Sequence, residues 1–414
     1  DERQAQAALA AELLELDDGT WDATPVTMTS ARRVTNASFV RLFPLIGVKN
    51  AEVPSLRKYK GRLVFAGNNV RDSSFEVILW NETTSSPTSM TIIKVLTAWS
   101  FSLDSEPEAA DAIKAYTQTP VPEYLVVFLI IEYSMLTPRM KAIVDRLGTR
   151  DVCWRLRRVL YGLTVAGFLW QEHFAQIMKD LHWLEVPCAP QTWVKVTSDG
   201  PAACSTYVDD ITMFGKGLAK LWKELEKVVA ITPPETLRRL LGLNFHYQKV
   251  GDSWYLKQSM SGFLELCLER YRAVDNAPQL NTRASTPWYE TTPTDWTQEV
   301  VGGGVFSSTS ASLLMSVLYA ARMYRYDLLF TTVFCARLVS RWSTLADKYV
   351  VQLFSYIART INLELVGIIK VGECLALIEG GKPNIEKTQT AEPAAEAPVK
   401  SASKMVAPLA PLSP

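Results

Sequence analysis

The chain has 414 residues, 48% hydrophobic and 21% charged, a composition that excludes a disordered or fibrous protein and favours two or three packed subdomains. Lysine plus arginine equals aspartate plus glutamate at 43 each, so the overall charge gives no support for nucleic-acid binding, and a phosphate-binding surface has to be local. Two runs of basic residues offer such a surface, although each is equally compatible with ordinary solvated charge. They comprise Arg32, Arg33, Arg41, Lys49, Arg57, Lys58, Lys60 and Arg62, and then Arg150, Arg155, Arg157 and Arg158.

Cysteine and histidine usage argues against a structural zinc site. The six cysteines show no CxxC spacing and the chain has only three histidines, as expected of an intracellular protein with reduced thiols. The most apolar stretch, residues 124–131, is too short to span a bilayer, and no signal peptide is evident. We therefore expect no membrane partner and no secretion. The first residue is Asp1 rather than methionine, which suggests a piece of a longer polyprotein.

Hydrophobic periodicity predicts an α+β fold in which helices and strands alternate. A short, peripheral amphipathic helix is predicted at residues 2–16, and the tail, rich in Ala, Pro, Glu, Lys and Ser, is predicted to be disordered. Between them the predicted elements are strands at 61–79, helices at 86–99 and 164–183, a strand–turn–strand unit at 191–214, a helix at 218–230, strands at 237–248 and 254–257, and helices at 260–271, 312–340 and 348–361.

The sharpest local feature is the tetrapeptide Tyr207-Val208-Asp209-Asp210 within an apolar strand pattern. Two adjacent carboxylates in such a pattern are costly to desolvate unless a cation meets them. A tight hairpin that displays both beside a divalent metal ion would remove that cost. An ordinary Asp-Asp β-turn is the alternative, because turns favour aspartate for local hydrogen bonding.

A third carboxylate stands at a predicted strand-to-helix turn, where Asp111 is followed by Ala112 and, five positions on, by Tyr116. Taken alone, Asp111 is compatible with a helix N-cap. Together with the aspartate pair at 209–210, it resembles the palm of reverse transcriptases, in which carboxylates from a first strand and a YxDD hairpin hold two magnesium ions. Magnesium prefers oxygen ligands, and two ions about 4 Å apart activate an attacking hydroxyl and stabilise the leaving group.

Further segments occur in the order typical of Ty1/copia-type retrotransposon reverse transcriptases, and together they cover about residues 58–365. An ordered set of this kind is more specific than any one motif. The segments are 58–67 (KYKGRLVFAG), 152–163 (VCWRLRRVLYGL), 240–243 (LLGL), 255–258 (YLKQ), 286–287 (TP) and 318–328 (LYAARMYRYDL).

This resemblance implies an RNA-directed DNA polymerase with Mg²⁺ or Mn²⁺ as cofactor and with an RNA template, a DNA primer and dNTPs as partners. It also implies partner domains of a Gag-Pol polyprotein, such as integrase and ribonuclease H, and a location in the nucleus or in a cytoplasmic virus-like particle. The implied catalytic and metal-binding residues are Asp111, Asp209 and Asp210. The implied nucleotide-binding residues are Arg62, Lys60, Ala112, Tyr116 and Tyr207, and the implied primer and template contacts are Leu241, Gly242, Tyr161 and Gly162.

The fold that the resemblance implies is a right-hand polymerase. Its palm is expected to be an antiparallel sheet that carries the YVDD hairpin and has helices on one face. The expected divisions are an N-terminal extension at 1–50, fingers at 51–106, the palm with the remainder of the fingers at 107–260, a helical thumb or connection at 261–375, and a disordered tail at 376–414. No ribonuclease H segment follows Leu365 in the sequence given, so template removal is expected from another domain or protein.

Departures from the family pattern keep other hypotheses open. Thr164 and Val165 stand where the family has Lys-Gln, whose Gln contacts the incoming nucleotide, and Tyr326 replaces the proline of its R-P-D segment. These departures and the neutral charge favour a catalytically decayed remnant that only binds nucleic acid, whereas the retained aspartates favour an enzyme. A purely structural α+β protein with a coincidental YVDD is a third hypothesis.

Overall fold

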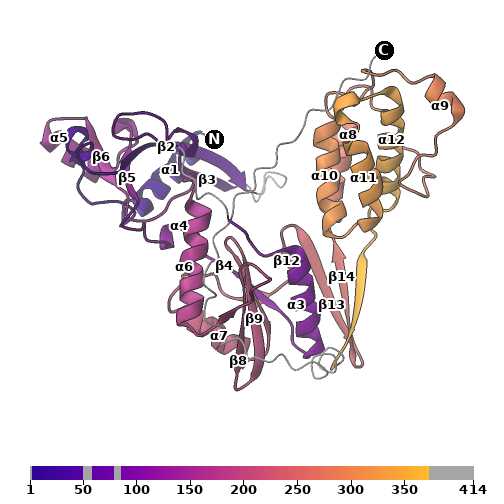
Figure 1. Ribbon diagram of the computed structural model, residues 1–414, viewed down its shortest axis with the longest axis horizontal. Helices are drawn as coiled ribbons and strands as arrows, with labels where there is room; N and C mark the ends of the chain where they lie inside the picture. Colours follow the sequence, from indigo (N-terminus) through magenta and orange to yellow (C-terminus); the bar gives the residue numbers. More distant parts are fainter. Residues whose placement is uncertain (1, 50–57, 79–84, 373–414) are drawn as a thin grey trace, which may run out of the picture.

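The computed structural model describes residues 2–49, 58–78 and 85–372. Its elements form three β-sheets with helices packed against them, so the α+β class predicted from the sequence is confirmed. Figure 1 shows an N-terminal lobe, a central sheet with helices beside it, and a C-terminal group of helices that stands at the end of long strands. The predicted disordered tail at 376–414 lies outside the described residues.

The N-terminal lobe is built on a five-stranded sheet with the order β1-β6-β5-β2-β3. Strand β2 pairs in parallel with β5 and antiparallel with β3. Helices α1 and α5 complete its hydrophobic core. The bounds are α1 (Glu2–Leu16), β1 (Val26–Thr27), α2 (Met28–Ala31), β2 (Ala37–Lys49), β3 (Lys58–Phe65), η2 (Gly67–Asn69), β5 (Val126–Ile130), η3 (Tyr133–Met135), α5 (Pro138–Leu147) and β6 (Val152–Arg155).

The strand pair predicted at 61–79 is half correct. Strand β3 forms, but its partner is β2, and the described residues 73–78 contain only an isolated bridge between Val77 and Arg71. The reason is a local turn in which the Asp72 carboxylate accepts hydrogen bonds from the backbone N–H groups of Ser74 and Glu76. Aspartate hydrogen-bonded in this way offers the backbone an alternative to a sheet ladder.

Helix α1 is not peripheral as predicted. Leu13 and Leu16 are buried in the core of the N-terminal lobe, and the helix backbone lies directly on β3. A Cβ at Gly61 would lie 2.7 Å from the carbonyl group of Ala8, so glycine is required for this close approach. Helix α1 therefore packs directly on the five-stranded sheet and belongs to the hydrophobic core of the N-terminal lobe.

The central sheet has six antiparallel strands in the order β11-β4-β10-β9-β8-β7. Cys204 and Met213 pack against α6 and α7, while their strand neighbours Ala203 and Phe214 pack in the same core as α3. Helices therefore cover both faces, and the prediction of helices on one face is wrong. The bounds are α3 (Met90–Ser102), β4 (Glu108–Asp111), α4 (Ala115–Gln118), α6 (Ala166–Asp180), β7 (Leu184–Glu185), β8 (Thr192–Thr197), β9 (Gly200–Tyr207), β10 (Asp210–Gly215), α7 (Leu218–Leu225) and β11 (Glu235–Thr236).

The C-terminal lobe combines a four-stranded sheet, β12-β13-β14-β15, with a group of helices. The helix predicted at 312–340 is broken, because Arg325 is buried at the break and binds Asp327 and the carbonyl of Thr360. Strand β15 was not predicted. The bounds are β12 (Arg239–Leu240), β13 (Leu243–Val250), β14 (Ser253–Ser259), α8 (Ser261–Arg272), α9 (Pro293–Thr297), α10 (Ser310–Met323), η4 (Tyr326–Leu328), α11 (Leu329–Ala336), η5 (Val339–Arg341), α12 (Thr344–Arg359) and β15 (Leu365–Lys370).

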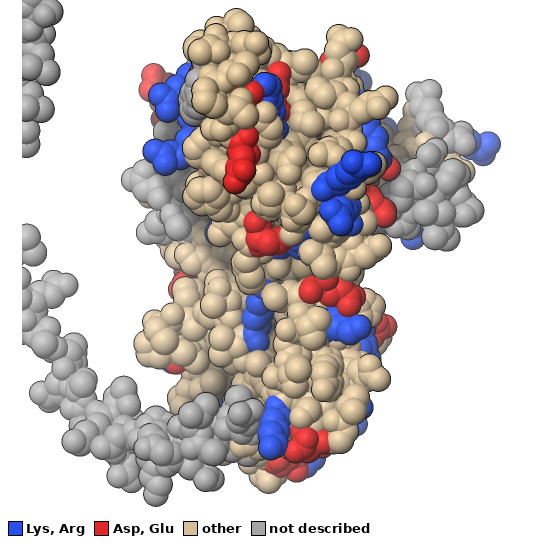
Figure 2. Space-filling view, turned by 90° about the vertical axis from the view of Figure 1, so that its right-hand side faces the viewer, with Lys and Arg blue, Asp and Glu red and all other residues tan. Residues whose placement is uncertain are grey.

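Charged side chains of both signs are interspersed over the face shown in Figure 2, in keeping with the neutral overall charge. Part of the second basic run is engaged within the protein, since Arg157 pairs with Asp22 and the Arg150 guanidinium lies 4.2 Å from the ring centroid of Tyr133. None of the described helices combines the length and apolar character needed to cross a membrane.

Asp347 organises the C-terminal group of helices from within. Its carboxylate is 9% exposed and accepts hydrogen bonds from the Trp342 indole at 2.8 Å and from the backbone N–H groups of Val305 and Phe306 at 2.6 and 3.2 Å. One buried side chain thus satisfies three donors from two segments of the chain. Leaving such donors unpaired costs more than the hydrogen bonds contribute.

Asp347→Ala should therefore lower the free energy of unfolding by about 2–4 kcal/mol, because three buried donors lose their acceptor. Urea unfolding followed by far-UV circular dichroism measures this loss. Asp252→Ala is the matched control, since Asp252 is 69% exposed and lies 3.8 Å from Lys370, an exposed ion pair that contributes little. Equal losses in the two variants would contradict the role of Asp347.

Candidate active site

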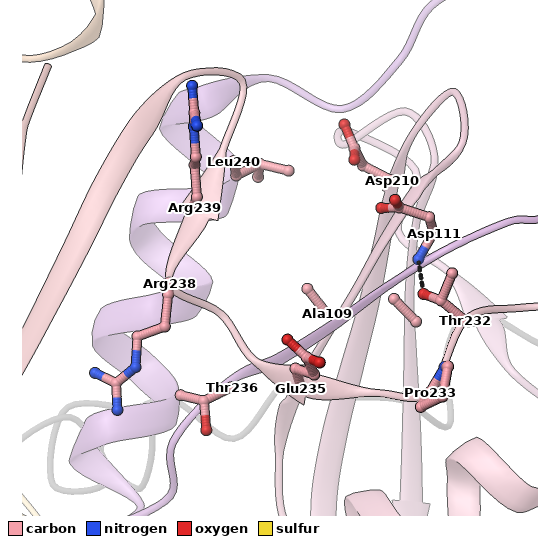
Figure 3. Close-up of a pocket in the computed structure, with 11 residues that line it drawn as sticks. Ala109, Asp111, Asp210, Thr232, Pro233, Glu235, Thr236, Arg238, Arg239 and Leu240 are labelled. Atoms are coloured by element: carbon pink, nitrogen blue, oxygen red, sulfur yellow. Dashed lines mark hydrogen bonds between the residues drawn. The ribbon is translucent and has the colours of Figure 1, made fainter. Parts of the chain in front are cut away.

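Two of the predicted aspartates meet across adjacent strands of the central sheet. Asp111 is the last residue of β4 and Asp210 is the first residue of β10, and the antiparallel register places them directly opposite each other. Thr232 fixes the end of β4, because its hydroxyl accepts the Asp111 N–H at 2.9 Å and its own N–H donates to the Asp111 carbonyl at 2.9 Å. Figure 3 shows the two carboxylates on one wall of a cavity, with Thr232 below them.

The turn between β9 and β10 is strained and is held in place from outside. Val208 has a φ of 59°, a left-handed conformation that is unfavourable for a β-branched residue. Its carbonyl accepts a hydrogen bond from the Trp170 indole on α6 at 2.7 Å. The next carbonyl, that of Asp209, accepts the N–H of Ala112 at 2.7 Å. The turn is thus attached to both α6 and β4.

The electrostatics of the turn reflect three carboxylates close together. Burial, and then the negative charges of Asp209 and Asp111, raise the pKa of Asp210 to about 6, and a hydrogen bond between the protonated carboxyl and Asp111 acts in the same direction. Asp209 is exposed, and its charge acts on two phenol groups as well as on Asp210. Burial first and then the charge of Asp209 raise the pKa of both Tyr116 and Tyr161.

The donor set suits a hard divalent cation. All three side chains supply carboxylate oxygens, and none of them forms an ion pair with another described residue. Within the described ranges, no three Asp, Glu, His or Cys side chains are grouped closely enough to hold a metal ion together. The structure thus sets Asp111 directly opposite Asp210 and places Asp209 next to Asp210 on the adjoining turn.

A cavity of about 320 Å³ opens beside Asp111 and Asp210. In Figure 3, Arg238 and Arg239 project from the segment opposite the two carboxylates, and Glu235 lies between. The cavity therefore presents negative charge on one wall and positive charge on the other. Neither arginine belongs to the predicted site, because a double arginine before a strand has no distinguishing pattern in the sequence.

Contacts between side chains link several of the predicted nucleotide-binding residues to the residues around the turn. The Arg62 guanidinium on β3 lies 5.5 Å from the ring centroid of Tyr161, and the rings of Tyr161 and Tyr116 meet edge to face at 5.0 Å. Ala112 is buried behind them, and Lys60 lies on β3 opposite Gly47. Arg62, Tyr116 and Tyr161 therefore share one region with Asp209, between the N-terminal lobe and the central sheet.

Leu241 and Gly242, predicted to contact primer and template, form the turn between β12 and β13. Both residues have positive φ values, 49° and 79°, which is unusual for leucine. The hydroxyl group of Tyr319 on α10 donates to the Leu241 carbonyl at 2.7 Å, and Tyr319 is also near enough to Tyr207 for the two phenols to interact electrostatically. The turn is therefore tied to the C-terminal helices.

Several residues that support the site were missed by reading the sequence. Trp170, Thr232 and Tyr319 act through hydrogen bonds to backbone atoms that are distant in the chain. Local patterns carry no signal for such contacts. The left-handed residue Val208 had an indirect signal, because a two-residue turn inside an apolar strand pattern requires unusual backbone angles.

Comparison with known proteins assigns the chain to a family. Residues 46–280, more than half of the 414 residues, match the family described as Reverse transcriptase (RNA-dependent DNA polymerase). A transposon Ty5-1 protein of Saccharomyces cerevisiae is 30% identical over 105 residues, which are 25% of this chain and 34% of that protein. The Retrovirus-related Pol polyprotein from transposon TNT 1-94 of Nicotiana tabacum is 26% identical over 231 residues, 55% of this chain and 16% of that protein.

The chain therefore belongs to the reverse transcriptase (RNA-dependent DNA polymerase) family. Within that family it is of the Ty1/copia retrotransposon type, and the resemblance drawn from the ordered motifs is confirmed. The matched region spans only 34% and 16% of the two relatives.

Gly162, which follows Tyr161, lies against the end of β3, the strand that carries Arg62. It has a φ of 87°, and a Cβ there would lie 2.4 Å from the Phe65 carbonyl oxygen at the end of β3. Gly162→Ala should lower the free energy of unfolding by about 3 kcal/mol or more, because backbone strain and a backbone clash add together. Gly148→Ala should lose only about 1–2 kcal/mol, because the φ of Gly148 is 65° with open space around it. Similar urea unfolding curves for the two variants would contradict the close approach.

Proposed function

We propose that the chain is an RNA-directed DNA polymerase that transfers nucleotides from dNTPs to the 3′-hydroxyl of a primer on an RNA template. The observation that carries this proposal is the pairing of Asp111 with Asp210 across β4 and β10, with Asp209 on the adjoining turn. Membership of the reverse transcriptase family supports it. The N-terminal lobe would serve as fingers, the central sheet as palm and the C-terminal lobe as thumb or connection.

Mg²⁺ or Mn²⁺ is the proposed cofactor, with Asp111 and Asp209 as its ligands and Asp210 beside them. When bound, such ions lower the pKa of the primer hydroxyl and stabilise the charge that develops on the phosphate oxygens. The chain's own contribution is to position the ligands. Trp170 and Ala112 hold the turn that carries Asp209, and Thr232 holds the strand end that carries Asp111.

The region around Arg62 is the proposed nucleotide site. The guanidinium of Arg62 and the ammonium of Lys60 supply positive charge for phosphate oxygens, and a guanidinium binds them with two parallel hydrogen bonds. Tyr116 presents a half-buried ring on the same side as Asp209 and would lie against the sugar. Tyr161 supports both, since it contacts the Tyr116 ring and lies under Arg62.

The turn at Leu241 and Gly242 is the proposed contact to the primer and template. Backbone strain of the kind seen at Leu241 persists where the surrounding structure over-determines it, often at functional sites. Other domains of a Gag-Pol polyprotein, including integrase and ribonuclease H, would act with this chain in the nucleus or in a virus-like particle.

Asp209→Asn should reduce primer extension on a poly-rA/oligo-dT template by at least about a hundredfold, because it removes one charge that the metal ions and phosphate require. Template binding, measured by fluorescence anisotropy, should stay at the parent level. Asp199→Asn is the matched control, since Asp199 is a partly exposed carboxylate next to the β8–β9 turn of the same sheet and pairs with Lys220. Parent-level extension by Asp209→Asn would exclude the proposed site.

A decayed remnant that only binds nucleic acid is the second candidate function. The observation that favours it is Val165, which precedes α6 with its side chain buried in the N-terminal core, so no amide is offered to a nucleotide there. Template binding by the parent protein with no extension in either Mg²⁺ or Mn²⁺ would establish this alternative. Restoring the family residue with Val165→Gln would then test whether one position accounts for the loss.

Tyr116→Ala should raise ribonucleotide incorporation relative to deoxynucleotide incorporation by at least about tenfold, because the ring would exclude a 2′-hydroxyl. Single-nucleotide extension with matched ribo- and deoxynucleotides measures the ratio. Tyr116→Phe keeps the ring and should leave the ratio unchanged. A ratio unchanged by the alanine, in a folded protein, would show that Tyr116 only packs against Tyr161.

A further inference from the structure

Lys114 occupies an unusual position between the candidate metal ligand Asp111 and Tyr116. Its φ is 51°, which is the left-handed conformation. This conformation is unfavourable in free energy for any residue other than glycine. The conformation is stabilised from both sides of the chain: the Thr117 N–H and hydroxyl group donate to the Lys114 carbonyl, and the Gln118 amide donates to the carbonyl of Ile113. The backbone thus projects this side chain in a fixed direction.

The Lys114 ammonium group is held by a helix from the other end of the sequence. It lies 2.9 Å from Glu12 and 2.7 Å from Glu15, which are carboxylates on α1. Burial is the largest single effect on the pKa of Lys114 and lowers it. Hydrogen bonds to the two carboxylates, together with their negative charges, outweigh burial, so the pKa is raised overall. The lysine is therefore charged, half-buried and already bound.

One of the two α1 carboxylates, that of Glu12, also lies near the proposed nucleotide region. Burial raises the pKa of Tyr161 first, and the charges of Asp209 and Glu12 add to it while Arg62 opposes them. The charges of Glu12, Arg62 and Asp209 therefore all act on the phenol group of Tyr161. The Glu12 side chain is only 12% exposed, so its charge is poorly screened by water at this place.

The charge balance of this cluster conflicts with the ligand that the region is proposed to bind. Two carboxylates and one ammonium leave a net charge of minus one beside a site for a nucleoside triphosphate, which is itself strongly negative. Buried like charges repel, whereas a lysine ammonium is a common partner of phosphate oxygens. Glu12 thus opposes the ligand directly, and Glu12 and Glu15 together occupy the lysine that would attract it.

We propose that Lys114 is a phosphate-binding residue of the nucleotide site and that Glu12 and Glu15 of α1 hold it in reserve until a triphosphate displaces them. This inference rests on the proposed function, because it needs a triphosphate between Arg62 and the Asp209 turn. Nucleotide binding then exchanges a lysine–carboxylate contact for a lysine–phosphate contact. The N-terminal helix acts as a restraint on nucleotide affinity.

Equilibrium binding of dTTP and of inorganic tripolyphosphate to the full chain, measured by isothermal titration calorimetry, tests this exchange without requiring catalysis. Glu12→Gln/Glu15→Gln should lower Kd for both ligands by at least about fivefold, because repulsion is relieved and the lysine is released. Lys114→Gln should raise Kd by at least about fivefold, because the cation is lost. Glu224→Gln, which breaks the lysine–glutamate pair with Lys195 on β8, is the matched control and should leave Kd unchanged.

The proposal predicts that Kd falls in the glutamate variant and rises in the lysine variant. A salt bridge with only a structural role predicts that Kd changes in the same direction in both variants. Glu15→Gln alone supplies a second variant, because Glu15 is 64% exposed and its loss does not disturb the core. Primer extension by the parent combined with one Kd for all variants would overturn this inference and leave the proposed function standing. Failure of every variant and of the parent to bind either ligand would overturn both.

Discussion

The register between β4 and β10 is the constraint on which the candidate site depends. It sets Asp111 opposite Asp210 and brings Asp209 onto the adjoining turn, so three carboxylates lie close together at the ends of two interior strands. Their repulsion has to be offset by the rest of the fold. Antiparallel pairing along β4, β10 and β9, the Trp170 indole and the Thr232 hydroxyl supply backbone hydrogen bonds that do not neutralise the charge. The carboxylates are thus held in position and remain available to a cation.

Much of the fold follows from local patterns, because helical periodicity and alternation reflect burial of one face. The residues at 164–183 and 191–214 illustrate this, and they form α6 and the strands β8, β9 and β10. Strand β2 was missed because Pro44 and Gly47 lie within it, and both residues ordinarily weaken a strand assignment. The site aspartates were predicted from their chemistry, whereas the residues that hold them act across long sequence separations. No local pattern records which backbone carbonyl an indole will reach.

Helix α1 has a structural role that its sequence pattern alone does not reveal. Its alanine-rich run is weakly amphipathic and gave the impression of a peripheral segment. Contact with β3 at Gly61 brings it close to the sheet, and this closeness allows Glu12 and Glu15 to reach Lys114. The same helix therefore fills the core of the N-terminal lobe and sets the charge beside Tyr161. A change in its packing would alter both properties together.

Strands β14 and β15 have a mechanical consequence. The chain leaves the four-stranded sheet at the end of β14, forms the C-terminal helices, and returns to pair with β14 again through β15, from Gln258 opposite Leu365 to Ser253 opposite Lys370. The helices thus stand on two neighbouring strands rather than on one linker (Figure 1). Two hydrogen-bonded strands resist twisting of the helices relative to the sheet more than a single linker would. The hydrogen bond from Tyr319 on α10 to the Leu241 carbonyl joins the helices to this sheet at a further place, the turn that precedes β13, so the position of the helices and the position of that turn are coupled.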